Sequence, residues 1–466
     1  MSHMENLNDK QKEAAIHQDG PLLIVAGAGA GKTKTITHRI VNLIKNGIAP
    51  EKILAVTFTN KAAKEMRDRI LKAIGQNLPL ANFGPHEIPF ISTFHALGVY
   101  IIKENARTLG LTRYFSILDE GQAITIIKDI IKDNLNLDPK KYAPRAIRSI
   151  ISKEKGKFVT LDEFTKTVSE EDYFYKIVIQ VWSLYEKQKT KENVVDFDDL
   201  LLKTTELLKN NEVARKYYQN KWKYIHIDEY QDTNTVQYLM AHLLAGDNKN
   251  ICVVGDPDQC IYSWRSADLK NILNFQKNYP ETQIVLLEEN YRSTQNILAA
   301  ANEIIKKNKY RADKNLFTNN LAGEKLSVYE AMDENDEADF VARKILEIWK
   351  SELCKPRSEV SKSDLSVLGK SDLHTSDPHI SIAILYRANF QSRALEEAML
   401  RYNIPYQVLG VKFFERKEVK DVLAYLRAAL NPENLSDIKR IINFPARGIC
   451  KATLVKIFAK ENLPIK

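Results

Sequence analysis

Cysteine is scarce in this sequence, with four in 466 residues, and none stands in a Cys-x-x-Cys pair. Such pairs are the usual mark of structural zinc sites, and dense, evenly numbered cysteines mark the disulfide frameworks of small secreted domains. The sequence therefore predicts neither a zinc site nor a disulfide framework. A reducing compartment fits this cysteine usage best, and we expect a cytoplasmic protein.

Long apolar runs are also missing. No stretch approaches the roughly 18 apolar residues of a membrane-spanning helix, and the N-terminus lacks the basic-then-apolar pattern of a signal peptide. A strong excess of one charge is missing too, because 68 Lys and Arg residues face 60 Asp and Glu residues, for a net charge of +8. We therefore expect no membrane association, and a polyanionic partner is compatible with this charge without being required by it.

Short apolar segments, most of them followed by a turn and a segment of helical period, organise much of the chain. The first two are 22–25 and 53–58, and similar segments return at 224–227, 251–254 and 284–287. Alternation of buried strands with helices is typical of a parallel α/β sheet. Because single cores rarely grow beyond about 250 to 300 residues, we also expect several domains.

The remaining segments differ from this alternation. Between 94 and 196, apolar residues recur every three to four positions, which predicts a helical subdomain inserted into the α/β core. A helix around 340–349 and a strand at 382–386 indicate a further α/β unit, and the chain is helical again from about 413. Residues 355–379 are rich in Ser, Lys, Asp and Pro, so we expect a disordered insertion or a long surface loop there.

A glycine-rich loop stands between the first predicted strand and the helix after it. It reads Ala26-Gly27-Ala28-Gly29-Ala30-Gly31-Lys32-Thr33-Lys34, and a phosphate-binding loop requires this placement. In such a loop the glycines let backbone N–H groups converge on phosphate oxygens, Lys32 brings charge to the terminal phosphates, and Thr33 can ligate Mg²⁺. Ala26 departs from the strict pattern, which has glycine there, and a glycine-rich turn that binds nothing is the alternative.

Two adjacent carboxylates, Asp228 and Glu229, follow the strand predicted at 224–227. The metal of a phosphate site needs a carboxylate at the end of a neighbouring strand, which makes Asp228 the metal-ligand candidate beside Thr33. Glu229 is placed to accept a proton from water that attacks the terminal phosphate, a role that separates a hydrolase from a nucleotide binder. Alone, this string is an ordinary strand end, but together with the glycine-rich loop it predicts ATP hydrolysis with Mg²⁺.

Longer strings carry a family resemblance. Residues 227–234 (IDEYQDTN) resemble the Walker B motif, and residues 254–265 (VGDPDQCIYSWR) resemble motif III, of UvrD/Rep/PcrA-type superfamily 1A DNA helicases. The family's Q motif and motifs Ia, Ib and IV are matched in the same order by LNDKQ at 7–11, AVTFTNKAA at 55–63, STFH at 92–95 and ENYRS at 289–293. The resemblance spans nearly the whole chain. It implies a P-loop NTPase, with RecA-like parallel-sheet motor domains and inserted helical subdomains.

The resemblance also assigns roles around the nucleotide. It implies that Gln11 and Arg39 recognise and pack on adenine and that Tyr291 stacks on the base. Arg292 would reach the γ-phosphate from the second motor domain, and Gln259 would contact that phosphate and report its presence to the DNA-binding residues that follow. The catalytic residues would then be Lys32, Glu229, Gln259 and Arg292.

The expected partners are single-stranded DNA and junctions between single strands and duplex. Single strands are held by aromatic stacking and a basic track along the backbone, and Trp264 is the strongest stacking candidate. By family analogy the same channel is lined by Phe58, Asn60, His95, Phe197, Tyr262 and Arg265. A further basic run is either a grip on duplex phosphates or a solvated helix face, and it comprises Lys140, Lys141, Arg145, Arg148, Lys153, Lys155 and Lys157.

In family terms, domain 1A comprises 4–92 and 197–285, domain 1B 93–196, the first part of domain 2A 286–412, and the start of domain 2B 413–466. Motifs V and VI are absent, so the chain resembles a C-terminally truncated member. Motif VI supplies an arginine whose loss can cost about 10³-fold or more in rate. We therefore expect this polypeptide to bind ATP but to hydrolyse it poorly and not to unwind duplexes. DNA-stimulated turnover at ordinary helicase rates would contradict this.

As a full-length family member, the protein is expected to be an ATP-dependent 3′-to-5′ DNA helicase or translocase that acts in DNA repair or replication. One alternative is the ATPase part of a helicase–nuclease complex, which the compact spacing from Lys32 to Arg292 disfavours. The other is a nucleotide-gated DNA-binding module without catalysis, which the presence of Lys32, Asp228 and Glu229 disfavours.

Overall fold

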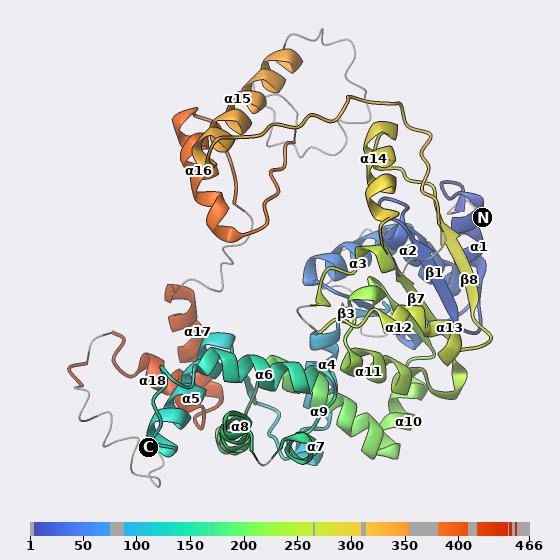
Figure 1. Cartoon of the computed structure of the whole chain (residues 1–466). Helices are drawn as coiled ribbons and strands as arrows, with labels where there is room; N and C mark the ends of the chain where they lie inside the picture. The colour runs from blue at the N-terminus through green and yellow to red at the C-terminus, as the bar shows by residue number, and fades with distance from the viewer. Residues whose placement is uncertain are drawn as a thin grey trace. The chain divides into compact units, whose positions relative to one another are not determined.

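The fold is known from a computed structural model (Figure 1), which describes residues 4–74, 88–169, 171–263, 266–308, 314–353, 381–408, 417–445, 447–449 and 453. The chain forms two compact units: one is Met1–Lys325 together with Asp421–Lys466, and the other is Leu326–Lys420. Among the helices in the described ranges, none is long and apolar enough to cross a membrane.

The first unit is built on a six-stranded parallel sheet with the strand order β3-β2-β6-β7-β1-β8. The strands are β1 (Leu22–Ala26), β2 (Ile53–Thr57), β3 (Phe90–Thr93), β6 (Tyr224–Ile227), β7 (Ile251–Gly255) and β8 (Gln283–Leu287). The predicted parallel α/β sheet is therefore confirmed, and every strand except β3 was expected within one residue of its observed bounds.

Both faces of the central strands of this sheet are buried, and alternate residues of β1, β2, β6 and β7 serve two separate cores. Leu23 and Val25 of β1 share one core with Ile225, whereas Leu22 and Ile24 belong to the other. This is why the strands appear in the sequence as continuous apolar runs. The first core is covered by α4 (Phe94–Glu104), α9 (Phe197–Asn210), α10 (Glu212–Lys221) and α11 (Thr235–Ala245), and the second by α1 (Asp9–Ile16), α2 (Lys32–Lys45) and α3 (Asn60–Ala73).

The helical insertion is confirmed. Its core joins side chains such as Ile127, Ile147 and Trp182 from three helices. Its ends meet in a two-stranded parallel ladder, in which β4 (Ser116–Ile117) pairs with β5 (Val194–Val195). The other elements of the insertion are α5 (Glu120–Asp129), a π-helical turn (Ile130–Asn134), α6 (Pro144–Gly156), α7 (Leu161–Thr167) and α8 (Tyr173–Lys191).

The C-terminal part of the first unit lies on this insertion. It contains the end of α17 (Lys417–Leu430) and α18 (Leu435–Ile441). The buried Asn431 side chain donates hydrogen bonds to the carbonyls of Glu192 (3.1 Å) and Asn193 (3.0 Å), and Gln122 donates one to the buried carboxylate of Asp437 (3.0 Å). These contacts satisfy backbone groups at the point where the insertion returns to the sheet.

The second unit contains α15 (Glu334–Leu353) and α16 (Ser392–Arg401), which pack through Ala338, Ala342 and Met399. The strand predicted at 382–386 is wrong: those residues have no regular structure and are mostly exposed, because no described strand of this unit pairs with them. The predicted loop at 355–379 lies outside the described residues.

The compact units do not divide where the predicted domains do. Residues 286–325, assigned above to domain 2A, belong to the first unit. The reason is direct contact with the glycine-rich loop, where Asn290 donates to the carbonyl of Ala28 (2.7 Å) and the Tyr291 N–H donates to that of Gly29 (3.0 Å). The four-domain division itself stays a prediction.

Gly98 sets how closely α4 approaches α9, because a Cβ at this position would collide with the backbone carbonyl of Leu200. We expect Gly98→Ala to lower the free energy of unfolding by about 1–3 kcal/mol, measured by urea denaturation. Gly121→Ala is the control, because its Cβ meets only the flexible Asp119 side chain at 3.2 Å, and it should be neutral or stabilise α5 by up to about 1 kcal/mol. An unchanged midpoint for Gly98→Ala would contradict this packing.

Candidate nucleotide and DNA sites

The glycine-rich loop runs from the end of β1 to the start of α2. Gly31 precedes α2 in a left-handed conformation (φ 82°) and provides no side-chain cap to the helix. Gly29 is also left-handed (φ 70°), and a Cβ on it would lie 2.8 Å from the Cβ of Arg292. Gly31 therefore gives the first N–H groups of α2 no side-chain acceptor. N–H groups at a helix N-terminus can then bind an anion.

Lys32 and Thr33, in the first turn of α2, meet the carboxylates that follow β6. The Lys32 ammonium lies 2.8 Å from the Glu229 carboxylate and 3.3 Å from the Gln259 side-chain oxygen. The Thr33 hydroxyl donates a hydrogen bond of 3.0 Å to Asp228. Strand order explains the meeting, because β7 alone separates β1 from β6 and all three strands end at one edge of the sheet.

Asp228 and Thr33 fit a Mg²⁺ site of the kind found in phosphate-transfer enzymes. One hydroxyl and one carboxylate are a small ligand set, but Mg²⁺ in such sites keeps several waters and takes further oxygens from the phosphates. No cluster of three or more His, Cys, Asp or Glu suited to a metal occurs among the described residues, so a metal cage made by protein alone is not what this part of the chain offers.

The charge of Asp228 is unfavourable without a cation. Burial and the neighbouring Glu229 raise the pKa of Asp228 to about 6. Glu229 itself has a left-handed backbone (φ 52°), which is rare for a residue with a side chain and costs on the order of 1 kcal/mol. Both features are local costs at the end of β6, and such costs are concentrated at functional sites.

The expected adenine and γ-phosphate residues surround the loop, with one exception. Gln11 is buried and donates to the carbonyl of Ala30 (3.0 Å), while Tyr291 is 49% exposed and its hydroxyl donates to Glu289 (2.6 Å). Arg292 is exposed beside Gly29. Arg39 is not brought to the site: its position on α2 turns it into the core, where it donates to the carbonyl of Gln18 (3.0 Å) and is 1% exposed.

Sequence reasoning missed Lys314, which stands in a polar stretch without a motif. Its ammonium is buried and contacts Asp256 and Asp258, the second at 3.1 Å. Asp256 also accepts a hydrogen bond from Gln259 (2.6 Å). A polar chain thus leads from Lys32 through Gln259 and Asp256 to Lys314, and only the tertiary fold reveals it.

Four of the predicted DNA-binding side chains form two aromatic pairs. Phe58 and Tyr262 are stacked, with centroids 5.4 Å apart and planes at 25°. His95 and Phe197 meet edge to face at 5.9 Å, and Phe197 is 50% exposed. Asn60 is exposed at the start of α3. Trp264 and Arg265 lie outside the described residues.

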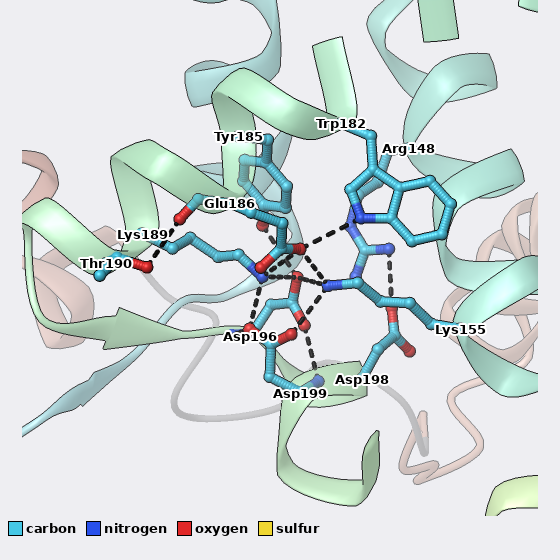
Figure 2. Close-up of polar contacts among 10 residues, drawn as sticks. All are labelled: Arg148, Lys155, Trp182, Tyr185, Glu186, Lys189, Thr190, Asp196, Asp198 and Asp199. Atoms are coloured by element: carbon cyan, nitrogen blue, oxygen red, sulfur yellow. Dashed lines mark hydrogen bonds and ion pairs between the residues drawn. The ribbon is translucent and has the colours of Figure 1, made fainter. Parts of the chain in front are cut away.

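The basic run of the insertion is not one surface. Lys155 is 1% exposed and Arg148 is paired with Asp198 at 2.8 Å (Figure 2), so neither is available to DNA phosphates. For these two residues, a grip on duplex phosphates and a solvated helix face are therefore both wrong. They fail because carboxylates from elsewhere in the chain attract these cations inward. The exposed members are Lys140, Lys141, Arg145, Lys153 and Lys157.

A parallel sheet whose first strand leads through a glycine-rich loop into a helix, with Lys32 and Thr33 facing Asp228 and Glu229, defines a P-loop NTPase. Comparison with known proteins narrows this class. The family described as UvrD/REP helicase N-terminal domain matches residues 7–280, and the one described as UvrD-like helicase C-terminal domain matches residues 285–465. The chain belongs to the UvrD/Rep helicase family.

Two relatives show how similar the chain is to individual members. It is 43% identical over 463 residues to a protein of Staphylococcus aureus named ATP-dependent DNA helicase PcrA, and 42% identical over 463 residues to the protein of that name from Staphylococcus epidermidis. Each match covers 98% of this chain and 59% of the relative.

The raised pKa of Asp228 predicts a pH-dependent stability cost. Since its folded-state pKa of about 6 exceeds the ordinary 3.8, this group makes the folded state more stable as pH falls from 7 toward 4. Asp228→Asn should therefore raise the free energy of unfolding by about 1–3 kcal/mol at neutral pH without Mg²⁺, and the gain should vanish near pH 4. The measurement is thermal unfolding across this pH range in EDTA.

The control for this prediction is Asp247→Asn, which neutralises an exposed carboxylate and should leave the unfolding profile unchanged. A gain from Asp228→Asn that stays constant between neutral pH and pH 4 would show that the Asp228 proton is not its source.

Proposed function

We propose that this chain is the motor part of an ATP-dependent DNA helicase that moves on single-stranded DNA. The chain by itself would bind ATP with Mg²⁺ and single-stranded DNA but would hydrolyse ATP poorly. The observation that carries the proposal is the position of Lys32 between Glu229 and Gln259. Gln259 stands three residues before Tyr262, whose ring stacks on Phe58. A short covalent and polar path therefore joins the phosphate loop to an aromatic surface suited to bases.

The roles of the residues follow from their chemistry. Lys32 would bind the terminal phosphates, while Thr33 and Asp228 would hold Mg²⁺, which supplies charge neutralisation at the phosphates when bound. Glu229 would orient the attacking water and accept its proton. The Glu229 carboxylate and the Lys32 ammonium lie 2.8 Å apart, so both groups can act on the same phosphate. Tyr291 and Arg292 would close on the nucleotide from the far side of the loop.

Coupling of the nucleotide site to DNA binding requires two states of the protein that differ in DNA affinity. Binding of the γ-phosphate would draw Gln259 and Lys32 toward it and so shift the segment that carries Tyr262. The 3′-to-5′ direction and a role in repair or replication rest on the family resemblance. The DNA substrates proposed are single strands and their junctions with duplex, and the cell compartment proposed from the cysteine usage is the cytoplasm.

Glu229→Gln tests hydrolysis separately from binding. It removes the proton acceptor but keeps a polar side chain of the same size, so MgATP binding should be retained while turnover falls by about 10²-fold or more. Fluorescent-nucleotide titration and phosphate release measure the two quantities. Glu281→Gln, an exposed glutamate, is the control and should change neither. Unchanged turnover in Glu229→Gln would favour the alternative of a nucleotide-gated DNA-binding module.

Tyr262→Ala tests the DNA surface. Loss of one stacked base is worth about 1–3 kcal/mol, so affinity for an oligothymidylate should fall by about fivefold to 150-fold in fluorescence anisotropy. Tyr114→Ala removes the same ring from a position that is 68% exposed and belongs to neither aromatic pair, and it should have no effect. Equal losses in both variants would show that Tyr262 is no specific contact.

A further inference from the structure

Seven charged side chains, four of them buried and three half-buried, gather where the helical insertion meets α9 (Figure 2). We call this set the buried ion cluster: three cations and four carboxylates, contributed by α6, by α8 and by the residues around the start of α9. Its members are Arg148, Lys155, Glu186, Lys189, Asp196, Asp198 and Asp199.

The two lysines bridge the insertion and α9. Lys155 lies 2.7 Å from Glu186 and 2.8 Å from Asp199, and Lys189 lies 2.9 Å from Glu186 and 2.5 Å from Asp199. Both lysines also contact Asp196, at 3.4 and 3.2 Å. Lys155, Lys189, Asp196 and Asp199 are each 1–2% exposed. Tyr185 and Trp182 donate further hydrogen bonds, to Asp196 (3.1 Å) and Glu186 (3.2 Å).

Stability alone is a poor explanation for such a cluster. Removing this many charges from water costs several kcal/mol per ion, and apolar side chains of the same volume often give equal or greater stability. Burial alone would raise the pKa of Asp196, but Lys155 and Lys189 hold it well below its ordinary value. Asp196 is therefore ionised in its contacts with the two lysines, and what the cluster provides beyond stability is fixed geometry.

The geometry it fixes is that of the first turn of α9. Asp196 caps this helix and forms a capping box with Asp199, whose backbone N–H donates to it at 2.9 Å. Phe197 lies between the two and is the exposed residue of the turn. The residue before Phe197 and the two residues after it thus belong to the cluster, while the phenyl ring is exposed.

Two other segments predicted to bind DNA lie near the same cluster. Phe197 meets His95 edge to face, and Asp198 is close enough to His95 to oppose the lowering of the His95 pKa by burial. Gly156 follows Lys155 at the end of α6, and a Cβ added to it would lie 3.4 Å from the Cβ of Ser266, the residue directly after Trp264 and Arg265. The cluster therefore borders two of the segments expected to contact DNA.

We propose that the buried ion cluster positions Phe197 and His95 for single-stranded DNA, with Arg148 of the insertion as the positioning residue that acts through its ion pair with Asp198. This inference rests on the proposed function, because it assumes that Phe197 contacts DNA. Arg148 itself touches no DNA. Its pair with Asp198 lies outside the nearly fully buried centre of the cluster, with side chains 12% and 23% exposed, so it can be changed without removing an ion from the centre.

The first test is a double-mutant cycle on oligothymidylate affinity. Phe197→Ala should weaken binding by about fivefold to 150-fold, and Arg148→Gln should weaken it severalfold. The double variant should be no weaker than Phe197→Ala alone, because Arg148 acts through that ring. Arg145→Gln is the matched control: it removes the same charge from an exposed position of α6 and should reproduce only the general electrostatic loss.

Salt dependence separates positioning from phosphate contact. A lost phosphate contact reduces the slope of log affinity against log salt by about one, whereas a positioning residue leaves that slope unchanged. The Asp198→Asn variant separates the two explanations by the sign of its effect. Simple electrostatics predicts tighter DNA binding, because a negative charge is removed, whereas positioning predicts weaker DNA binding. This variant also keeps the test open if Arg148→Gln does not fold.

Additive losses in the cycle, a reduced salt slope in Arg148→Gln, or tighter binding by Asp198→Asn would each overturn the inference. So would a Phe197→Ala variant that binds as tightly as the unmodified protein. Absence of DNA binding by the unmodified protein is a different result, because it removes the proposed function on which the inference rests. Unchanged affinity for MgATP in the folded variants shows that the nucleotide site is intact.

Discussion

The contact between the first turn of α2 and the carboxylates after β6 is the interaction on which the nucleotide site depends. Lys32 and Thr33 come from one strand–helix junction, and Asp228 and Glu229 come from another, far away in the sequence. Parallel strands bring such junctions to one edge of a sheet, and the order β6-β7-β1 leaves room between them for the segment that carries Gln259. The site is therefore a direct result of strand order.

Two features that raise the free energy of the folded protein lie at this site, where a bound ligand can offset such costs. Asp228 is buried next to Glu229, so its ionised form is disfavoured until a cation arrives. The backbone of Glu229 is in a left-handed conformation (φ 52°). A divalent cation with its phosphate groups would offset the first cost, which is the burial of the Asp228 charge. Part of the binding free energy would therefore come from removing a cost already present in the protein.

Local sequence patterns were sufficient for five of the six strands and for the phosphate loop, because each of these depends on residues adjacent in the chain, whereas β3 was missed. Buried strands appear as apolar runs, and the loop has a fixed spacing between Gly27 and Thr33. Sequence patterns did not predict the position of a charged side chain where its burial depends on distant parts of the chain. Lys155 looks like a surface cation until Asp196 and Asp199 are brought to it, Arg39 turns into the core, and Lys314 finds its carboxylates only through the fold. The apolar segment 382–386 lacks a partner strand, which no window of sequence reveals.

The short ladder between β4 and β5 has a further consequence for the thermal fluctuations of the first unit. The two ends of most of the helical insertion leave the first core side by side, through two residues on each strand. Opening the insertion as a unit would break this ladder and the ion pairs of Lys155 and Lys189 to Asp199, but it would leave the six-stranded sheet paired. Amide hydrogens of the insertion and of the sheet can thus exchange with solvent at different rates.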